Sequence, residues 1–164
     1  MYFSYSRWFD AIHMSRICAL LKINGITDIR NDRAWQLKGE SWSPAKLSPD
    51  NVNAMVAQDG VIFAAGDDGF IARSYGNAWA HSPNPTSFDL HAITFAGSHP
   101  VAGGTGGLIL RFNGVTWSQE ASPTQSAVRG LSGLESGVLF MVAGPTLYTH
   151  DGVEWTDSVS ANVA

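Results

Sequence analysis

The chain has 164 residues, of which 45% are hydrophobic and only 15% are charged, and its formal net charge at pH 7 is −4. This composition excludes a disordered chain and indicates one compact, strand-rich domain over residues 1–164, because a chain of this length can bury a core. The acidic balance argues against a nucleic-acid binder, which needs a basic face.

Residues 1–22 are rich in apolar side chains, but Arg7, Asp10, His13 and Arg16 interrupt them. A signal peptide needs a basic start and an unbroken apolar core, and a membrane-spanning helix needs about 20 apolar residues. Neither is predicted, so the chain as given is expected in the cytoplasm, or outside it if its start has been trimmed. Cys18 is expected to be a buried apolar residue, since a single cysteine cannot form an internal disulfide.

A tryptophan recurs along the chain with a glycine three residues before it. The pairs are Gly39 and Trp42, Gly76 and Trp79, Gly114 and Trp117, and Gly152 and Trp155. The tryptophans are 37, 38 and 38 residues apart. This period predicts four copies of one unit, over approximately residues 15–50, 51–88, 89–126 and 127–164. Residues 1–14 could supply a strand of a partial preceding unit.

Each copy contains short apolar runs separated by turn residues. In the third copy the runs are Ala92–Phe95, Pro100–Ala102, Leu108–Phe112 and the stretch after Trp117. They are too short for helices, and turns such as Asn113-Gly114 tolerate the positive φ of tight hairpins. Each copy is therefore predicted to be a small antiparallel sheet of three or four strands.

Sheets repeated at about 40 residues are typical of β-propeller blades, which bury their faces against one another around an axis. The predicted fold is all-β: a β-propeller of about four small blades, either a closed four-blade ring or a partial arc of a larger propeller. A linear array or sandwich of the same hairpins is the alternative.

The repeated pattern resembles bacterial propeller repeats that are grouped as photosystem II assembly factor-like and sialidase-type (BNR-like). The residues that carry the resemblance are Ala65-Gly66, Gly69, Ile71, Arg73, Gly76 and Trp79, with Gly103-Gly104, Gly107, Ile109, Arg111, Gly114 and Trp117 in the next copy. The resemblance implies a propeller over nearly the whole chain from about Ile17. Propeller blades serve binding, assembly and catalysis alike, so it implies no single activity.

The match to the sialidase-type repeat is incomplete. In the Asp box of that family the aspartate lies five residues before the tryptophan, whereas Asp151 lies four before Trp155. The other copies have Lys38, Tyr75 and Asn113 at that place. This departure argues against a glycosidase.

The four tryptophans are predicted to be structural plugs between neighbouring blades, each burying its indole and donating its N–H locally. The alternative is a set of platforms on which sugar rings stack. Identical placement in every copy favours the structural role, because a repeated residue supports the repeated unit.

No catalytic residue, metal site or cofactor is predicted. The glycine-rich segment 103–107 is interpreted as a turn, because residues 65–69 repeat it and the Lys-Ser/Thr of a phosphate loop is absent. Asp67-Asp68 lack the further carboxylates of a calcium loop, and the five histidines show no metal spacing. Arg73 and Arg111 are predicted to be surface residues rather than a sialidase-like carboxylate clamp.

One polar position stands out as a ligand-binding candidate. It comes directly after the first apolar residue of each predicted innermost strand, and its occupants are Arg16, Asn53, His91 and Arg129. The first strand of a blade lies nearest the axis, so these residues predict a polar ring at the mouth of the central channel. The alternative is a water-lined channel that holds no ligand.

The sequence therefore favours a non-enzymatic propeller module. It is expected to bind another protein or to self-associate, through loops, the channel mouth or open blade faces. A carbohydrate-binding propeller that uses Tyr75, Tyr148 and Trp35 is the first alternative, and a sialidase-type hydrolase fragment is the second. No nucleic-acid or membrane partner is expected.

Overall fold

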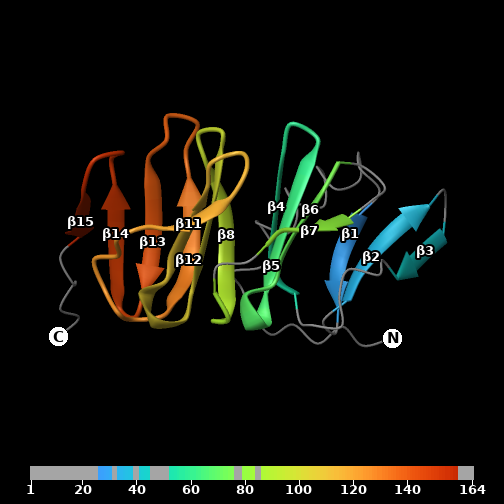
Figure 1. The fold of residues 1–164 in the computed structure, drawn as a ribbon, viewed down its shortest axis with the longest axis horizontal. Coiled ribbons are helices and arrows are strands. Elements are labelled where there is room, and N and C mark those ends of the chain that lie inside the picture. The colour runs from blue at the N-terminus through green and yellow to red at the C-terminus, as the bar shows by residue number, and fades with distance from the viewer. Residues whose placement is uncertain are drawn as a thin grey trace, which may run out of the picture.

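The computed structural model describes residues 26–30, 33–38, 41–44, 52–75, 79–83 and 86–158, the first three of these ranges by their backbone. These residues form four antiparallel sheets that follow one another along the molecule (Figure 1). Every sheet is a meander in which strands that are consecutive in the chain pair side by side. The prediction of an all-β chain built from repeated small sheets is confirmed.

The first sheet consists of β1 (Ile26–Arg30), β2 (Arg33–Lys38) and β3 (Ser41–Pro44). The second consists of β4 (Val52–Gln58), β5 (Val61–Gly66), β6 (Ile71–Ser74) and β7 (Trp79–His81). The third consists of β8 (Leu90–Ala96), β9 (His99–Gly104), β10 (Ile109–Phe112) and β11 (Trp117–Gln119). The fourth consists of β12 (Val128–Gly133), β13 (Leu139–Ala143), β14 (Thr146–His150) and β15 (Trp155–Ser158). Two single-turn 3₁₀ segments, η1 (Asp67–Gly69) and η2 (Thr105–Gly107), link β5 to β6 and β9 to β10.

The second, third and fourth sheets pack through their first strands, as expected of propeller blades. β4 lies beside β8, and β8 lies beside β12. The apolar core accordingly lies between sheets: Phe63 and Ile71 of the second sheet pack against Leu110 of the third, while Val101 of the third packs against Met141 of the fourth. Successive side chains of a strand point to opposite faces, so each central sheet supplies both of its faces to the core.

The described sheets form an arc. β3 and β15 lie at opposite ends of the row in Figure 1. Among the described strands, those of the fourth sheet do not pack extensively against those of the first. Of the two arrangements expected from the sequence, these residues adopt the partial arc.

The repeated glycines that the structure describes lie in turns. Gly114 has φ 99° and Gly152 has φ 105°, a left-handed conformation that suits glycine. In the glycine-rich turn η2, a Cβ on Gly107 would lie 1.9 Å from the carbonyl oxygen of Thr124, so this position also needs the space. Gly39 and Gly76 lie outside the described residues.

The tryptophans do not all behave alike. Trp117 is 5% exposed, and its ring centroid lies 6.0 Å from that of Phe63 on the second sheet, so it plugs the space between two sheets as predicted. Its Nε1 has no hydrogen-bond partner in the described part of the chain, so the expectation that the indole N–H donates locally was wrong for this residue. Trp79 is half-buried against the apolar cluster of the second sheet, and Trp155 is half-buried against the cluster that the third and fourth sheets share. The side chain of Trp42 lies outside the described residues.

Within the described residues, no helix is both long and apolar enough to cross a membrane.

Candidate functional site

The predicted polar ring falls on a structural feature that the sequence analysis missed. In the second, third and fourth sheets the pairing of the first strand with the second skips one residue, and the skipped residues are Asn53, His91 and Arg129. Each is thus the extra residue of a β-bulge, which is left out of the ladder and redirects its side chain. A bulge at the same place in three sheets explains why this position is polar among apolar neighbours.

Two of these side chains bond within the fold. Nδ2 of Asn53 donates to Oδ1 of Asp67 at 2.6 Å and to the carbonyl oxygen of Leu90 at 3.0 Å, which ties β4 to η1 and to the next sheet. Nε2 of His91 lies 3.2 Å from Oγ1 of Thr105 in η2. These contacts give both residues a role in holding turns and sheets together.

Arg129 differs from them. It is exposed and makes no ion pair with any described residue. Arg16 lies outside the described residues. A ligand-binding role for the ring stays a prediction, with Arg129 as the described member whose charge is available.

A pocket opens at the other end of the sheets, between the second and the third. Its volume is about 320 Å³. The lining comes from the first hairpins and the last turns of the two sheets: Gln58, Asp59, Val61, Phe63, Tyr75, Phe95, Ser98, His99, Pro100, Phe112, Asn113 and Gly114. The bulges begin β4 and β8, whereas Gln58 ends β4, so the pocket and the polar ring lie at opposite ends of the strands.

The floor of the pocket is aromatic. The ring of Phe63 lies 5.9 Å from that of Phe95 at an interplanar angle of 76°, and 5.6 Å from that of Phe112. Edge-to-face contacts at this distance add to the stability that burial provides, so the floor is a fixed surface. Phe63 and Phe112 are buried, and Phe95 is half-buried.

Tyr75 stands at the mouth with 67% of its surface exposed. Cζ of Arg73 lies 5.5 Å from the Tyr75 ring centroid and 5.7 Å from that of Phe112. A guanidinium at this distance from two rings is attracted to both. Arg73 therefore holds an exposed aromatic side chain in place over an aromatic floor.

The repeat shows what Tyr75 replaces. At the same position in the third sheet, Oδ1 of Asn113 accepts hydrogen bonds from the backbone N–H groups of Val115 and Thr116, both at 2.9 Å. In the fourth sheet, Asp151 accepts in the same way from Val153 and Glu154. A tyrosine cannot cap a turn in this manner. At this position the second sheet has an exposed aromatic ring in place of a capping side chain.

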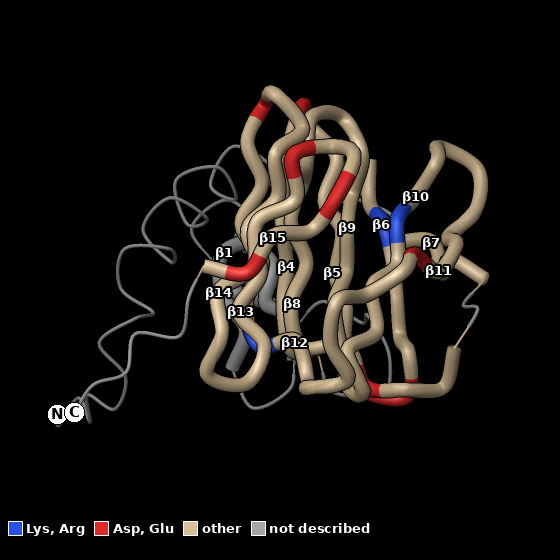
Figure 2. The backbone as a smooth tube through the Cα atoms, turned by 90° about the vertical axis from the view of Figure 1, so that its left-hand side faces the viewer, with Lys and Arg blue, Asp and Glu red and all other residues tan. Residues whose placement is uncertain are grey.

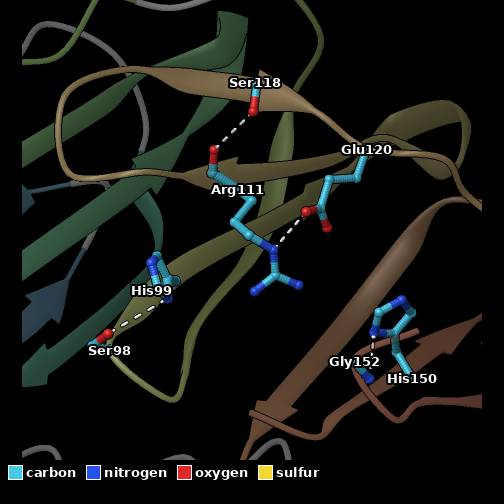
Figure 3. Close-up of polar contacts among 7 residues, drawn as sticks. All are labelled: Ser98, His99, Arg111, Ser118, Glu120, His150 and Gly152. Carbon is cyan, nitrogen blue, oxygen red and sulfur yellow. Dashed lines mark hydrogen bonds and ion pairs between the residues drawn. The ribbon is translucent and has the colours of Figure 1, made fainter. Parts of the chain in front are cut away.

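The two repeated arginines also differ. Nε of Arg111 donates to Oε1 of Glu120 at 2.6 Å (Figure 3). The backbone N–H of Ser82 donates to the carbonyl oxygen of Ile71, and that of Glu120 donates to the equivalent oxygen of Ile109. Ser82 is therefore the residue of the second sheet that corresponds to Glu120. Arg73 makes no ion pair with a described residue, and its guanidinium lies instead against the rings of Tyr75 and Phe112. Figure 2 shows the basic positions of β6 and β10 on the same side of the molecule.

The rim of the pocket is polar. Nε2 of Gln58 donates to the carbonyl oxygen of Gly97 at 3.2 Å, which joins the first hairpins of the two sheets. His99 is exposed, and its Nδ1 lies 3.5 Å from Oγ of Ser98 (Figure 3). Among the described residues, no group of three or more His, Cys, Asp or Glu side chains is arranged to hold a metal ion.

Of the aromatic residues that line this pocket, the sequence indicates only Tyr75 as a candidate for stacking on sugars. The phenylalanines were treated only as core, because a repeat pattern does not show that neighbouring sheets leave a gap above them. Tyr148, the second candidate, packs against the core between the third and fourth sheets. The side chain of Trp35 lies outside the described residues.

Comparison with known proteins supports the fold. No family model matches the chain, and no curated protein matches it. Among solved structures, the WD40 β-propeller domain of Doa1 is similar at a TM-score of 0.53 and 18% identity, over 65% of this chain and 40% of that one. YCF48 bound to D1 peptide is similar at a TM-score of 0.56 and 18% identity, over 82% of this chain and 53% of that one.

The extracellular domain of BT4673 from B. thetaiotaomicron is similar at a TM-score of 0.59 and 13% identity, over 82% of this chain and 22% of that one. The chain thus spans about half or less of the length of these three structures. At such identities the similarity shows the architecture alone. The chain is a β-propeller protein that resembles these propellers in fold.

Proposed function

We propose that this chain is a non-catalytic propeller module that binds an extended segment of another protein in the pocket between its second and third sheets. The observation that carries the proposal is Tyr75, an exposed aromatic side chain at a position that caps a turn in the next two sheets. Exposed aromatic residues that are held in place beside a pocket are typical anchors of protein interfaces.

The lining suits a peptide. The half-buried ring of Phe95 and the exposed ring of Tyr75 offer apolar area to one side chain of the segment, and burying an aliphatic or aromatic side chain contributes about 1.5–3 kcal/mol. The rim supplies the amide of Gln58 and the imidazole of His99 for the polar backbone of the ligand, which must keep its hydrogen bonds when it is desolvated. Arg73 adds a cation that can meet an acidic group. YCF48, a propeller of similar fold, is described as bound to a peptide.

A peptide library displayed on phage and selected on the immobilised chain tests the proposal. Selected peptides are expected to bind Tyr75→Ala at least about tenfold more weakly than the wild type, a loss of about 1.4 kcal/mol. The melting temperature is expected to stay the same, because Tyr75 is largely exposed. Val153→Ala is the matched control, since Val153 is 88% exposed on a turn of the fourth sheet and does not line the pocket.

Peptides that bind Tyr75→Ala and the wild type equally would show that the pocket is not the binding site. A selection that enriches no peptide would contradict the proposal as well.

A carbohydrate is the second candidate ligand, because an exposed tyrosine over a polar rim is also a surface on which a sugar ring stacks. A glycan array separates the two classes. Glycan binding that Tyr75→Ala abolishes, together with a phage selection that enriches nothing, would replace the peptide with a sugar.

A further inference from the structure

The turn between β10 and β11 contains an asparagine followed by a glycine, Asn113-Gly114. In such a pair the backbone nitrogen of the glycine can attack Cγ of the asparagine side chain, because glycine has no Cβ to hinder the approach. The attack closes a five-membered succinimide ring and expels ammonia. Asn113, Gly114, Val115 and Thr116 are all exposed, so water reaches the turn.

The nitrogen that would attack has no competing hydrogen bond within the described part of the chain. The backbone N–H of Gly114 donates to no other described residue. In the fourth sheet the equivalent N–H, that of Gly152, donates to Nδ1 of His150 at 3.1 Å (Figure 3). Phe112 stands in the place of His150, since each pairs with the tryptophan of its own hairpin. A phenylalanine has no acceptor atom, so the third sheet leaves this nitrogen available.

The side-chain carbonyl of Asn113 is held by the donors that the attack needs. Its Oδ1 accepts hydrogen bonds from the backbone N–H groups of Val115 and Thr116, both at 2.9 Å. Attack at Cγ turns this oxygen into an oxyanion, and a hydrogen bond becomes stronger when its acceptor becomes charged. The turn therefore stabilises the transition state more than the intact amide, as an oxyanion hole does.

Thr116 also contacts the group that leaves. Nδ2 of Asn113 lies 3.4 Å from Oγ1 of Thr116. When Cγ becomes tetrahedral, this nitrogen gains a lone pair, and the hydroxyl can then donate a proton to it. Proton transfer lets the nitrogen leave as neutral ammonia.

We propose that this turn promotes its own deamidation, so that Asn113 is a site of spontaneous modification. The bond between the nitrogen of Gly114 and Cγ of Asn113 forms as the N–H proton passes to a solvent base. The bond between Cγ and Nδ2 breaks as Oγ1 of Thr116 gives its proton to the leaving ammonia and regains one from water. Water then opens the succinimide, and residue 113 becomes aspartate or isoaspartate.

The fold accommodates the aspartate product. Asp151 occupies the equivalent position in the fourth sheet, where its Oδ1 accepts from the backbone N–H groups of Val153 at 2.8 Å and Glu154 at 3.0 Å. Asn113 lines the pocket between the second and third sheets, so the reaction adds a negative charge to the wall of that pocket. The modification thus changes the surface that the pocket offers, and it does not depend on what the pocket binds.

Peptide mapping by mass spectrometry, during incubation of the whole chain at neutral pH, tests the proposal. A synthetic peptide of residues 109–118 gives the rate of the same dipeptide without the fold. Deamidation of Asn113 is expected to be at least about fivefold faster in the chain than in the peptide, because the peptide does not hold two N–H donors on Oδ1.

Two variants test the role of Thr116. Thr116→Val removes the proton donor, and it is expected to slow deamidation in the folded chain at least about threefold while leaving the rate in the matching peptide unchanged. Ser118→Ala is the matched control. It removes another exposed hydroxyl of the same hairpin, one that donates to the carbonyl oxygen of Arg111, and it should deamidate like the wild type.

Circular dichroism shows whether each variant is folded. A chain that deamidates at Asn113 no faster than the peptide overturns the proposal, because the turn then restrains the asparagine instead of activating it. This comparison needs no variant, so it decides even if Thr116→Val fails to fold. A folded Thr116→Val variant that reacts as fast as the wild type overturns the proton transfer and the proposal with it. A faster chain, a slowed Thr116→Val and an unaffected Ser118→Ala establish Asn113 as the site.

Discussion

Replacing Trp117 by phenylalanine and by alanine separates the two things this residue does. Its indole fills the space between the second and third sheets, in contact with Phe63 and with Phe112, whose ring centroid lies 5.3 Å away. Its Nε1 is buried without a partner among the described residues. The ring stabilises the core, while an unsatisfied buried N–H costs about 1–3 kcal/mol.

The two effects predict different results for the two variants. Trp117 is 5% exposed, so Trp117→Ala removes nearly the whole of a buried aromatic side chain and leaves a cavity, at a cost of about 3–5 kcal/mol. Trp117→Phe keeps one ring beside Phe63 and removes the unpaired N–H. Its smaller loss of apolar area and its gain from removing the N–H offset each other, so its free energy of unfolding should lie within about 1 kcal/mol of the wild type.

Urea unfolding followed by circular dichroism, with linear extrapolation, measures both free energies. A Trp117→Phe variant that is as unstable as Trp117→Ala would refute the reasoning. That result would mean that the indole N–H forms a hydrogen bond in solution.

Two further predictions concern backbone contacts. Gly133→Ala should destabilise the chain by about 2 kcal/mol or more in urea unfolding, because the new Cβ would lie 1.9 Å from the carbonyl oxygen of Phe95 on the third sheet; wild-type stability would show that the sheets are not this close. Hydrogen bonds from the backbone N–H groups of Glu154 and then Val153 lower the pKa of Asp151 from its ordinary value of 3.8. Because the folded pKa is the lower one, the stabilisation is present above pH 3.8 and is lost as pH falls through the folded value. The difference in unfolding free energy between wild type and Asp151→Ala should therefore shrink as the solution is acidified, and an unchanged difference would contradict the pKa shift.

Several features of the fold follow from the sequence alone. The spacing of Gly114 and Trp117, repeated in the other copies, predicts small hairpin sheets because a tight turn needs a residue that tolerates positive φ. The apolar residues of β9 and β10 are consecutive, as in Pro100–Ala102 and Leu108–Leu110, so both faces of the sheet need cover, which neighbouring sheets can supply. These are local rules of the backbone and of solvent exclusion, so they can be read from one chain.

The candidate site was less predictable. The polar position that Asn53, His91 and Arg129 share was visible, but its cause was not, since a β-bulge depends on how two strands pair. The pocket was missed apart from Tyr75. Its phenylalanines look like ordinary core in the sequence, and only the spacing between the second and third sheets leaves a pocket in which Phe95 is half-buried.

The sequence by itself determined the unit: a glycine turn, an indole and short apolar strands, copied about every 38 residues, with turn chemistry and side-chain alternation fixed within each copy. The tertiary structure decided which side chains of different strands and sheets contact one another. The pairing of Arg111 with Glu120 and the contact of Arg73 with the ring of Phe112 both depend on contacts between separate strands or sheets. Equivalent residues of a repeat therefore come to differ in function because their neighbours differ, and one chain read in order does not show those neighbours.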